Sequence, residues 1–281
     1  MRAKVWKYAK TIGVAGTAAL ISVVYYQHQK QYTPVHASWT TNFEPSVKWD
    51  ENWDRRNPES IVKPLKSSAT EKDKKDYDNE LQKQTSTASR HLLLIRHGQY
   101  VLDGATDQQR ILTALGRKQA AYTGQRLKDM GYNYTDLISS TMARAVETSD
   151  IIHKFLPNLS IERDPLLCEG APIPPEPPVG HWRPEKSQFY QDGSRIEAAF
   201  RKYFHRAEPS QTTDSYEIIV CHANVIRYFV CRALQFPPEA WLRLGLHHSS
   251  ITWITIRPSG RVSLRQYGDS GFIPIEEVSS A

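Results

Sequence analysis

The residues best suited to chemistry in this 281-residue chain are Arg96, His97 and Gly98, which directly follow an apolar run at residues 92–95. Such a run between polar residues predicts a strand buried on both faces of a sheet. The carboxyl ends of strands in open α/β sheets face the ligand crevice. A permanently charged guanidinium, a nucleophilic imidazole and a glycine that lets a ligand approach the backbone would then lie together. This set suits phosphoryl transfer, although a lone Arg-His pair at a strand end also fits simple exposure to water.

A second apolar run, at residues 217–221, ends at His222 in the same way. A strand order that places the two runs side by side would bring His97 and His222 together. Arg144 falls in the first turn of a predicted helix, where the helix dipole and the guanidinium both favour an anion. Arg96, Arg144 and His222 are therefore expected to surround the oxygens of a phosphoryl group. His97 would attack its phosphorus in line.

Phosphoryl transfer also requires a proton for the leaving oxygen. Glu169, beside the proline-rich segment 171–184, is the candidate general acid, and apolar surroundings would keep it protonated. A metal site built from Glu169 and the two histidines is the first alternative, but the neighbouring guanidinium groups would repel a divalent cation. The interpretation therefore includes no metal and no cofactor.

A cysteine-dependent phosphatase is the second alternative, because Cys221 and Arg227 have the Cys-x5-Arg spacing of that class. No glycine lies between them, whereas such a loop must fold its amides around phosphate. Cys221 is better interpreted as a buried thiol at a strand end. The three cysteines, Cys168, Cys221 and Cys231, do not have the spacing of metal ligands. They also lie too far apart along the chain to indicate a disulfide framework.

From His91 onward, apolar strands alternate with amphipathic helices, which predicts an α/β three-layer sandwich with a mostly parallel central sheet. Thr113 is a suitable N-cap, and Gly131 a suitable end, for one helix. Ser194 is interpreted as the cap of another. Strands are expected at residues 92–95, 137–140 and 217–221, helices at about 114–130, 142–155 and 224–234, and a hairpin at residues 250–256 and 262–267.

The N-terminal residues 1–30 are basic, lack acidic residues and contain an uncharged segment at residues 11–26. This pattern indicates a single-pass membrane anchor, and its composition is closer to mitochondrial targeting than to secretion. A cleaved secretory signal is the alternative. The chain carries a net charge of +6, but its basic residues are scattered and form no stripe typical of nucleic-acid binding.

Residues 31–89 are polar and are expected to form a flexible linker before a catalytic domain at residues 90–281. The linker contains one island, defined here as residues 49–54, with two tryptophans and two aspartates each four residues apart. Two large aromatics are costly in a disordered tether, so the island is interpreted as a docking peptide. The alternative is that it packs on its own domain. Its candidate docking residues are Trp49, Asp50, Asn52, Trp53 and Asp54.

The ordered motifs from His91 to the C-terminus resemble the histidine phosphatase (phosphoglycerate mutase) superfamily. They include Arg96-His97-Gly98, the segment from Ser139-Ser140 to Thr148, the segment 167–170, and Val220-Cys221-His222. The resemblance implies a phosphoglycerate mutase-like fold, a phosphohistidine nucleophile at His97, an acid/base at Glu169 and phosphate-binding roles for Arg96, Arg144 and His222. The island resembles an assembly motif of one member of the family, with Glu51 where proline is usual, which implies self-association.

Departures from the mutase pattern narrow the expected substrate. Tyr100 and Asp103 replace the usual small hydroxyl residue and asparagine, and Ala223 and Asn224 replace the usual glycines after the second histidine. The resemblance therefore implies a membrane-anchored mitochondrial serine/threonine protein phosphatase, in the outer or the inner membrane. Its substrates would be phosphoproteins, signalling kinases among them. The alternatives are a catalytically weak scaffold that binds partners through the linker, and a mutase-type phosphatase of small molecules.

Overall fold

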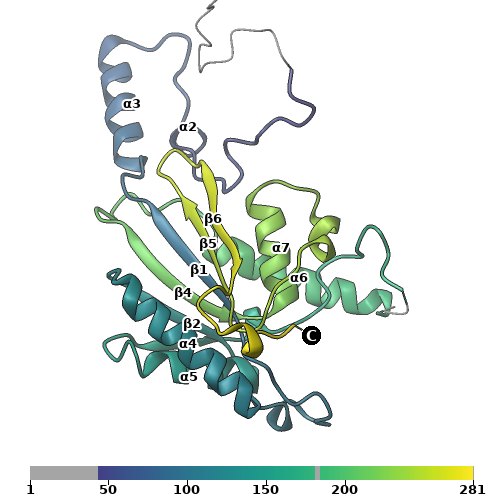
Figure 1. Cartoon of the computed structure of the whole chain (residues 1–281). Coiled ribbons are helices and arrows are strands. Elements are labelled where there is room, and N and C mark those ends of the chain that lie inside the picture. Colours follow the sequence, from purple (N-terminus) through teal and green to yellow (C-terminus); the bar gives the residue numbers. More distant parts are fainter. Residues whose placement is uncertain (1–43, 181–183, 281) are drawn as a thin grey trace, which may run out of the picture. The chain divides into compact units, whose positions relative to one another are not determined.

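A computed structural model describes residues 44–180 and 184–280 of the chain (Figure 1). Trp49 belongs to the same compact unit as the chain that follows it. The expected membrane segment at residues 11–26 lies outside the described residues. Among the residues that are described, no helix is long and apolar enough to cross a membrane.

A six-stranded sheet in the order β3-β2-β4-β1-β5-β6 forms the centre of this unit. Strands β3, β2, β4 and β1 run parallel to one another, whereas β5 and β6 are antiparallel additions, so the sheet is mixed. The strands are β1 (Arg90–Arg96), β2 (Asp136–Ser140), β3 (Ile161–Asp164), β4 (Ser215–Cys221), β5 (Ile251–Ile256) and β6 (Val262–Asp269). Strand β3 is the one that the sequence patterns did not predict, because its four residues are largely charged.

Helices cover both faces of the sheet, as expected for a three-layer α/β sandwich (Figure 1). Leu92 and Leu94 of β1 pack with α6 and α7 on one face, whereas Leu93 and Ile95 pack with α4 and α5 on the other. This alternation follows from the two-residue period of a strand and explains why the whole run is apolar. The α-helices are α2 (Pro58–Ile61), α3 (Glu71–Gln84), α4 (Ala114–Met130), α5 (Ala143–His153), α6 (Lys186–Tyr203) and α7 (Ala223–Ala233). Short 3-10 turns are η1 (Asp107–Gln109), η2 (Pro165–Leu167), η3 (Pro238–Arg243) and η4 (Ile275–Glu277).

Helix α4 begins and ends where its sequence signals predict. The Thr113 side chain accepts a hydrogen bond from the Gly116 N–H at 3.0 Å, and Gly131 closes the helix with φ 66°. The prediction that Ser194 caps a helix is wrong, because α6 starts eight residues earlier and runs through it. The Ser194 hydroxyl donates to the Tyr190 carbonyl one turn back, which lets a serine sit inside a helix.

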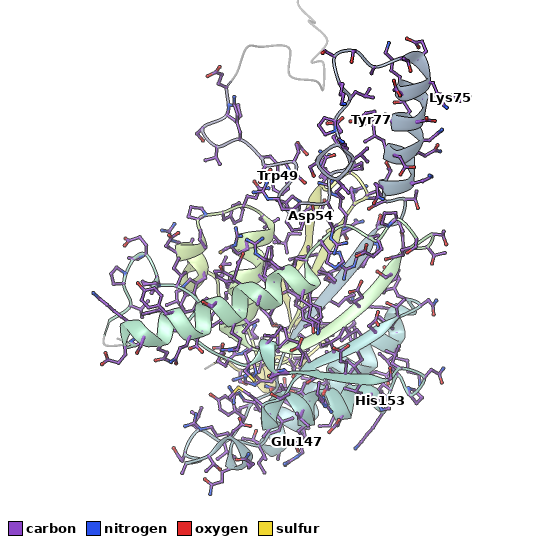
Figure 2. All side chains as sticks on the ribbon, turned by 180° about the vertical axis from the view of Figure 1, so that it is seen from behind. Trp49, Asp54, Lys75, Tyr77, Glu147 and His153 are labelled. Carbon is purple, nitrogen blue, oxygen red and sulfur yellow. The ribbon has the colours of Figure 1, made fainter. Side chains whose placement is uncertain are left out.

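The expectation of a flexible linker at residues 31–89 is also wrong for one stretch, because residues 71–84 form helix α3. A reciprocal capping box between Thr70 and Asp73 starts this helix, and the pairs Glu71–Lys74 and Glu80–Lys83 lie along it. The alternating acidic and basic residues that indicate a solvated linker therefore also form ion pairs between successive turns of one helix. Figure 2 shows Lys75 and Tyr77 on different sides of α3. Tyr77 lines a hollow together with Ile61 and Leu65.

Candidate active site

His97 lies directly after β1, and its side chain is only 2 % exposed. Its Nδ1 is 2.8 Å from the Gly98 carbonyl oxygen. Because a carbonyl can only accept, Nδ1 carries the proton and Nε2 keeps its lone pair. Burial, together with the neighbouring His222 and Arg144, lowers the pKa of His97 well below its ordinary value of 6.5. The ring is therefore neutral near pH 7, with Nε2 available as a nucleophile.

The pairing of β1 with β4 brings the two strand-end histidines together. Arg96 is opposite Cys221 in the parallel ladder of β1 and β4. The His97 N–H adds one more hydrogen bond to this ladder by donating to the Cys221 carbonyl at 3.0 Å. The rings of His97 and His222 are consequently 5.1 Å apart. His222 Nε2 lies 2.9 Å from the Ser140 hydroxyl, whereas its Nδ1 has no hydrogen-bond partner among the described residues. Burial and the charge of Arg144 lower the pKa of His222 well below its ordinary value.

Arg96 is a buried cation that forms no ion pair with a carboxylate of the described residues, although the charge of Glu169 acts on it. Its Nη1 donates to the Leu246 carbonyl at 2.6 Å and its Nη2 to His248 Nε2 at 3.1 Å. Its Nε has no partner within the described part of the chain. Burial is the main cause that lowers the pKa of Arg96 to about 10. The guanidinium remains charged at neutral pH and attracts an anion into this space.

Arg144 occupies the first turn of α5, which follows β2. Its Nε donates to His97 Nε2 at 3.2 Å, so a substrate must displace this bond before the imidazole can attack. Its Nη1 lies 3.5 Å from Asp107 Oδ1 but has no hydrogen bond to any described residue. Asp107 Oδ2 also accepts the N–H of Ala143 at 2.9 Å and thereby fixes the start of α5.

Several buried nitrogen atoms around His97 therefore lack hydrogen-bond partners in the described structure. They are Arg96 Nε, Arg144 Nη1, His222 Nδ1 and, close by on α7, Arg227 Nε. Buried polar groups are normally paired, because each unpaired one costs on the order of 1–3 kcal/mol. Unpaired groups that cluster around a nucleophile are what a site for a multiply charged oxyanion requires.

Glu169 lies against the same helix start. Its N–H is 3.3 Å from the sulfur of Met142, and Arg144 Nη2 is 3.6 Å from that atom. Burial raises the pKa of Glu169 above its ordinary 4.5, while the charges of Arg144 and Arg96 oppose the rise. Arg195 donates to the Glu169 carbonyl at 3.1 Å and holds this segment in place. The carboxyl group is thus poised to carry a proton.

The comparisons with known proteins agree with this chemistry. The sequence profile of the histidine phosphatase superfamily (branch 1) matches residues 92–171 and 176–269. The chain belongs to this superfamily. It is 51 % identical to the mitochondrial serine/threonine-protein phosphatase Pgam5 of Drosophila willistoni, covering 96 % of this chain and 95 % of that protein. It is 53 % identical to the protein of the same name from Drosophila pseudoobscura pseudoobscura, over 88 % and 86 % of the two chains.

Solved structures agree on the fold alone. A mycobacterial hydrolase superposes with a TM-score of 0.50 at 21 % identity, covering 65 % of this chain and 99 % of that one. These findings confirm the expected family and enzyme class: the chain is a phosphatase. The comparisons do not assign individual residues of this histidine phosphatase to the site; that assignment depends on the geometry described above.

The cysteine alternative does not fit this histidine phosphatase. Cys221 is fully buried, and burial raises the pKa of its thiol far above neutrality. A thiol in this state cannot supply the thiolate that such a mechanism needs. Cys221 instead packs in the core between the sheet and α7.

Sequence reasoning missed several residues around the site. Asp107 holds Arg144, Ser140 bonds His222, and His248 bonds Arg96. Arg195 and Arg227 contact or face the segment of the candidate acid. The sequence offers few signals for these contacts, because they join residues 26 or more positions apart. Ser140 and Arg227 do belong to sequence patterns, Ser140 to a family motif and Arg227 to the Cys-x5-Arg spacing, but neither pattern indicates these contacts.

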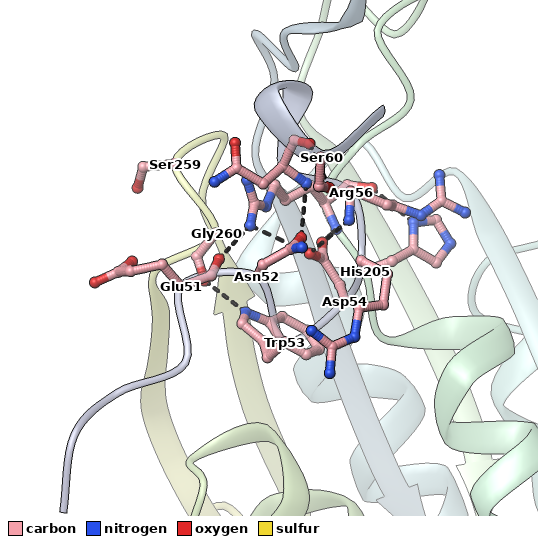
Figure 3. Close-up of polar contacts among 12 residues, drawn as sticks. Glu51, Asn52, Trp53, Asp54, Arg56, Ser60, His205, Ser259 and Gly260 are labelled. Atoms are coloured by element: carbon pink, nitrogen blue, oxygen red, sulfur yellow. Dashed lines mark hydrogen bonds and ion pairs between the residues drawn. The ribbon is translucent and has the colours of Figure 1, made fainter. Parts of the chain in front are cut away.

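The island at residues 49–54 packs on its own domain, far along the chain from the residues it contacts (Figure 3). Trp53 Nε1 donates to the Gly260 carbonyl at 2.8 Å, and its ring centroid is 6.1 Å from that of Phe200. Asp54, with a buried side chain, is 3.2 Å from Arg206 Nη2 and accepts the Arg206 N–H at 2.8 Å.

Other island residues form hydrogen bonds just after the island and to the rest of the domain. Asn52 Oδ1 accepts the Asn57 N–H at 3.0 Å, and the Asp50 N–H donates to Gln235 Oε1 at 2.8 Å. Trp49 lines a surface hollow with Val262. The island is therefore a folded peptide held by contacts with its own domain; Figure 2 labels its first and last residues, Trp49 and Asp54.

Proposed function

We propose that this phosphatase hydrolyses phosphoserine and phosphothreonine in mitochondrial proteins through a phosphohistidine formed on His97. One observation carries the proposal: a neutral histidine with an Nε2 lone pair lies beside a cluster of buried arginine and histidine nitrogens that lack hydrogen-bond partners among the described residues. The names of the Drosophila relatives, mitochondrial serine/threonine-protein phosphatases, support the substrate class and the compartment.

The first step transfers the phosphoryl group to the enzyme. Arg96, Arg144 and His222 bind its oxygens, and the Arg144 Nε–H moves from His97 Nε2 to an oxygen of the substrate. His97 Nε2 then attacks phosphorus while the bond to the serine or threonine oxygen breaks. Glu169 donates its proton to that oxygen, which leaves as the alcohol.

The second step returns the enzyme to its starting state. Glu169, now ionised, accepts a proton from a water molecule that attacks the phosphorus of phosphohistidine. The P–N bond breaks, inorganic phosphate forms and Glu169 is protonated again. The raised pKa of Glu169 suits both directions of this transfer.

Tyr100 supports a protein substrate over a sugar phosphate. Its ring lies edge-on to His97 at 5.0 Å, and the Arg144 guanidinium lies 4.7 Å from its centroid. An aromatic ring therefore borders the phosphate site where the mutase pattern has a small hydroxyl residue. A flat apolar border favours the side chain of a peptide over a polyhydroxylated substrate.

A substrate panel tests the proposal. The wild-type chain and His97→Ala are compared on phosphoserine and phosphothreonine peptides, including kinase activation-loop peptides, on 3-phosphoglycerate and on an aryl phosphate. Peptide turnover that exceeds phosphoglycerate turnover and disappears in His97→Ala is expected. A preference for phosphoglycerate would support the small-molecule alternative, and absence of turnover on all substrates would support the scaffold.

We further propose that the island mediates self-association. The segment at residues 55–89, which contains helices α2 and α3, joins the island to β1 and would let the same peptide reach the surface of a neighbouring copy, where the Trp53 and Asp54 contacts would be repeated. Trp49→Ala/Trp53→Ala is expected to lower both the mass measured by light scattering and the phosphatase rate. Val47→Ala, at a position 72 % exposed, is the control. Unchanged mass and rate would mean that the island only packs on its own domain.

Residues 11–26 are proposed as a single-pass anchor in a mitochondrial membrane. The sequons at Asn133 and Asn158 would be available to glycosylation in the endoplasmic reticulum but not in mitochondria. Fractionation of cells that express the full chain should place it in the mitochondrial membrane fraction without glycan. A glycan at either sequon would contradict this location.

A further inference from the structure

The C-terminal segment, defined here as residues 275–279, is joined by hydrogen bonds to residues next to His97, although no step proposed above uses it. The Gln119 side chain on α4 donates to the Ser279 hydroxyl at 2.9 Å and to the Glu277 carbonyl at 2.7 Å. Its Oε1 accepts the N–H of Gln99 at 2.9 Å. The segment is therefore joined through one side chain to the loop that follows His97.

His248 joins the same segment to Arg96. Its backbone N–H donates to the Ser279 carbonyl at 2.9 Å, and its Nδ1 lies 2.9 Å from the Ser279 hydroxyl. Its Nε2 lies 3.1 Å from Arg96 Nη2. A guanidinium can only donate, so Nε2 accepts and Nδ1 carries the proton that is donated to Ser279. The contacts thus form a directed chain from Arg96 through His248 to Ser279.

A neutral imidazole is a suitable partner for a guanidinium that must bind an anion. It fixes the direction of one N–H without cancelling the positive charge, whereas a carboxylate would hold the group and neutralise it. His248 is 3 % exposed, and burial with the charge of Arg96 lowers its pKa to about 3. The ring is therefore neutral near pH 7.

We infer that His248 and Ser279 are positioning residues that hold the Arg96 guanidinium in the orientation in which it binds the phosphoryl oxygens. The C-terminal segment is the support on which this orientation depends. The inference rests on the proposed function, because it takes Arg96 as a ligand of the phosphoryl group.

Two substitutions at His248 separate its two hydrogen bonds. In His248→Asn the short amide can replace Nδ1 toward Ser279 but does not reach Arg96, whereas in His248→Gln the longer amide can replace Nε2 as the acceptor. The full chain is assayed with an aryl phosphate, and orthovanadate is used as the inhibitor that mimics the transferred phosphoryl group. His248→Asn is expected to lower kcat and weaken vanadate inhibition about tenfold to a hundredfold, the usual cost of losing a hydrogen bond to a charged group. His248→Gln should recover most of both.

Ser279→Ala removes the hydroxyl that bonds His248 Nδ1 and leaves the His248 ring itself unchanged, so it tests the role of the C-terminal segment. It is expected to weaken vanadate inhibition less than His248→Asn, and Ser280→Ala, at the exposed neighbouring position, should leave it unchanged. Equal effects of Ser279→Ala and Ser280→Ala would overturn the role of the segment. Unfolding temperatures measured in parallel identify variants that have lost the fold. If the His248 variants are among them, the comparison of Ser279→Ala with Ser280→Ala tests the inference.

A double substitution distinguishes this inference from the proposed function. If His248 acts through Arg96, adding His248→Asn to Arg96→Ala causes no further loss of vanadate inhibition. An equal loss in both backgrounds, or equal losses for Asn and Gln at position 248, would overturn the inference while leaving the role of Arg96 intact. An Arg96→Ala chain with normal turnover would instead remove Arg96 from the proposed function, and the inference with it.

Discussion

Strand β1 carries a buried arginine at each end, and the two differ in their partners. Arg90 begins the strand at 6 % exposure, and Arg96 ends it at 5 %. Arg90 forms a two-pronged pair with the carboxylate of Glu217, with Nε at 2.8 Å from Oε1, and also donates to the carbonyl groups of Tyr203 and His205. Among the described residues, the Arg96 guanidinium donates to the Leu246 carbonyl and to a neutral histidine, forms no ion pair, and leaves its Nε without a partner.

The contrast is between a cation that is paired within the fold and a cation that is proposed to bind the phosphoryl group. A charge that is buried and fully paired contributes to the fold, and removing it leaves its carboxylate partner stranded. A charge that is buried and uncompensated weakens the fold until an anion arrives. Burial alone therefore does not distinguish the two arginines of β1, whereas the presence or absence of an ion-pair partner among the described residues does.

The largest effect on turnover is expected at the uncompensated end. Arg96→Ala should lower kcat on the order of a thousandfold, as for other arginines that stabilise phosphoryl transfer, with little loss of thermal stability. Arg96→Lys should recover little, because a lysine cannot reproduce the two-pronged geometry. Steady-state kinetics and thermal unfolding on the same samples measure both effects. A stability loss that matches the rate loss would mean that Arg96 is structural like Arg90.

The next effect concerns the proton donor. Glu169→Gln should lower the rate on phosphoserine peptides roughly a hundredfold or more, because the alcohol leaves poorly without a proton. An aryl phosphate, whose leaving group is stabilised without protonation, should lose much less. The ratio of kcat values on the two substrates measures this difference. Equal losses would exclude Glu169 as the acid.

A smaller effect is expected in the pH profile of kcat/KM. His97 reacts only when neutral, and its pKa lies well below 6.5, so activity should be lost on the acid side only below that value. Glu169 must be protonated, and its pKa is raised, so activity should fall as the pH rises through that pKa. The alkaline fall should disappear in Glu169→Gln. An acid limb centred at or above 6.5 would contradict the buried, neutral His97.

The smallest effect on turnover is expected at the paired end of the strand. Arg90→Gln should leave the rate of the folded enzyme nearly normal but destabilise the fold by about 3–5 kcal/mol, because Glu217 is left buried without its partner. Denaturant unfolding measures the loss, and Arg90→Gln/Glu217→Gln should recover part of it. A folded Arg90→Gln enzyme with a thousandfold lower rate would remove the distinction between the two arginines.

The sequence predicted those parts of the site that depend on local pattern. The apolar runs that end in His97 and His222, and the Thr113 and Gly131 signals of α4, are properties of short segments. The contact between the two histidines needed only the strand order. In the same way, Arg144 followed from its place in the first turn of α5.

The contacts that could not be predicted join distant segments. The choice of His248 as the partner of Arg96, 152 residues away, depends on how the turn before β5 lies against β1. Helix α3 was missed for another reason, since its polar composition suits both a solvated linker and a capped, ion-paired helix. Local pattern therefore located His97, the proposed nucleophile, while tertiary structure determined the hydrogen-bond partners of Arg96 beside it.

The most direct test of the account is to trap the phosphorylated enzyme. The full chain is mixed rapidly with a 32P-labelled phosphopeptide and quenched either in acid or in alkali, and the labelled protein is digested and mapped. A label that survives alkali, is lost in acid and maps to His97 is the predicted result, and it should persist in Cys221→Ser and vanish in His97→Ala. A label that survives acid, maps to another residue or remains in His97→Ala would contradict a phosphohistidine at His97.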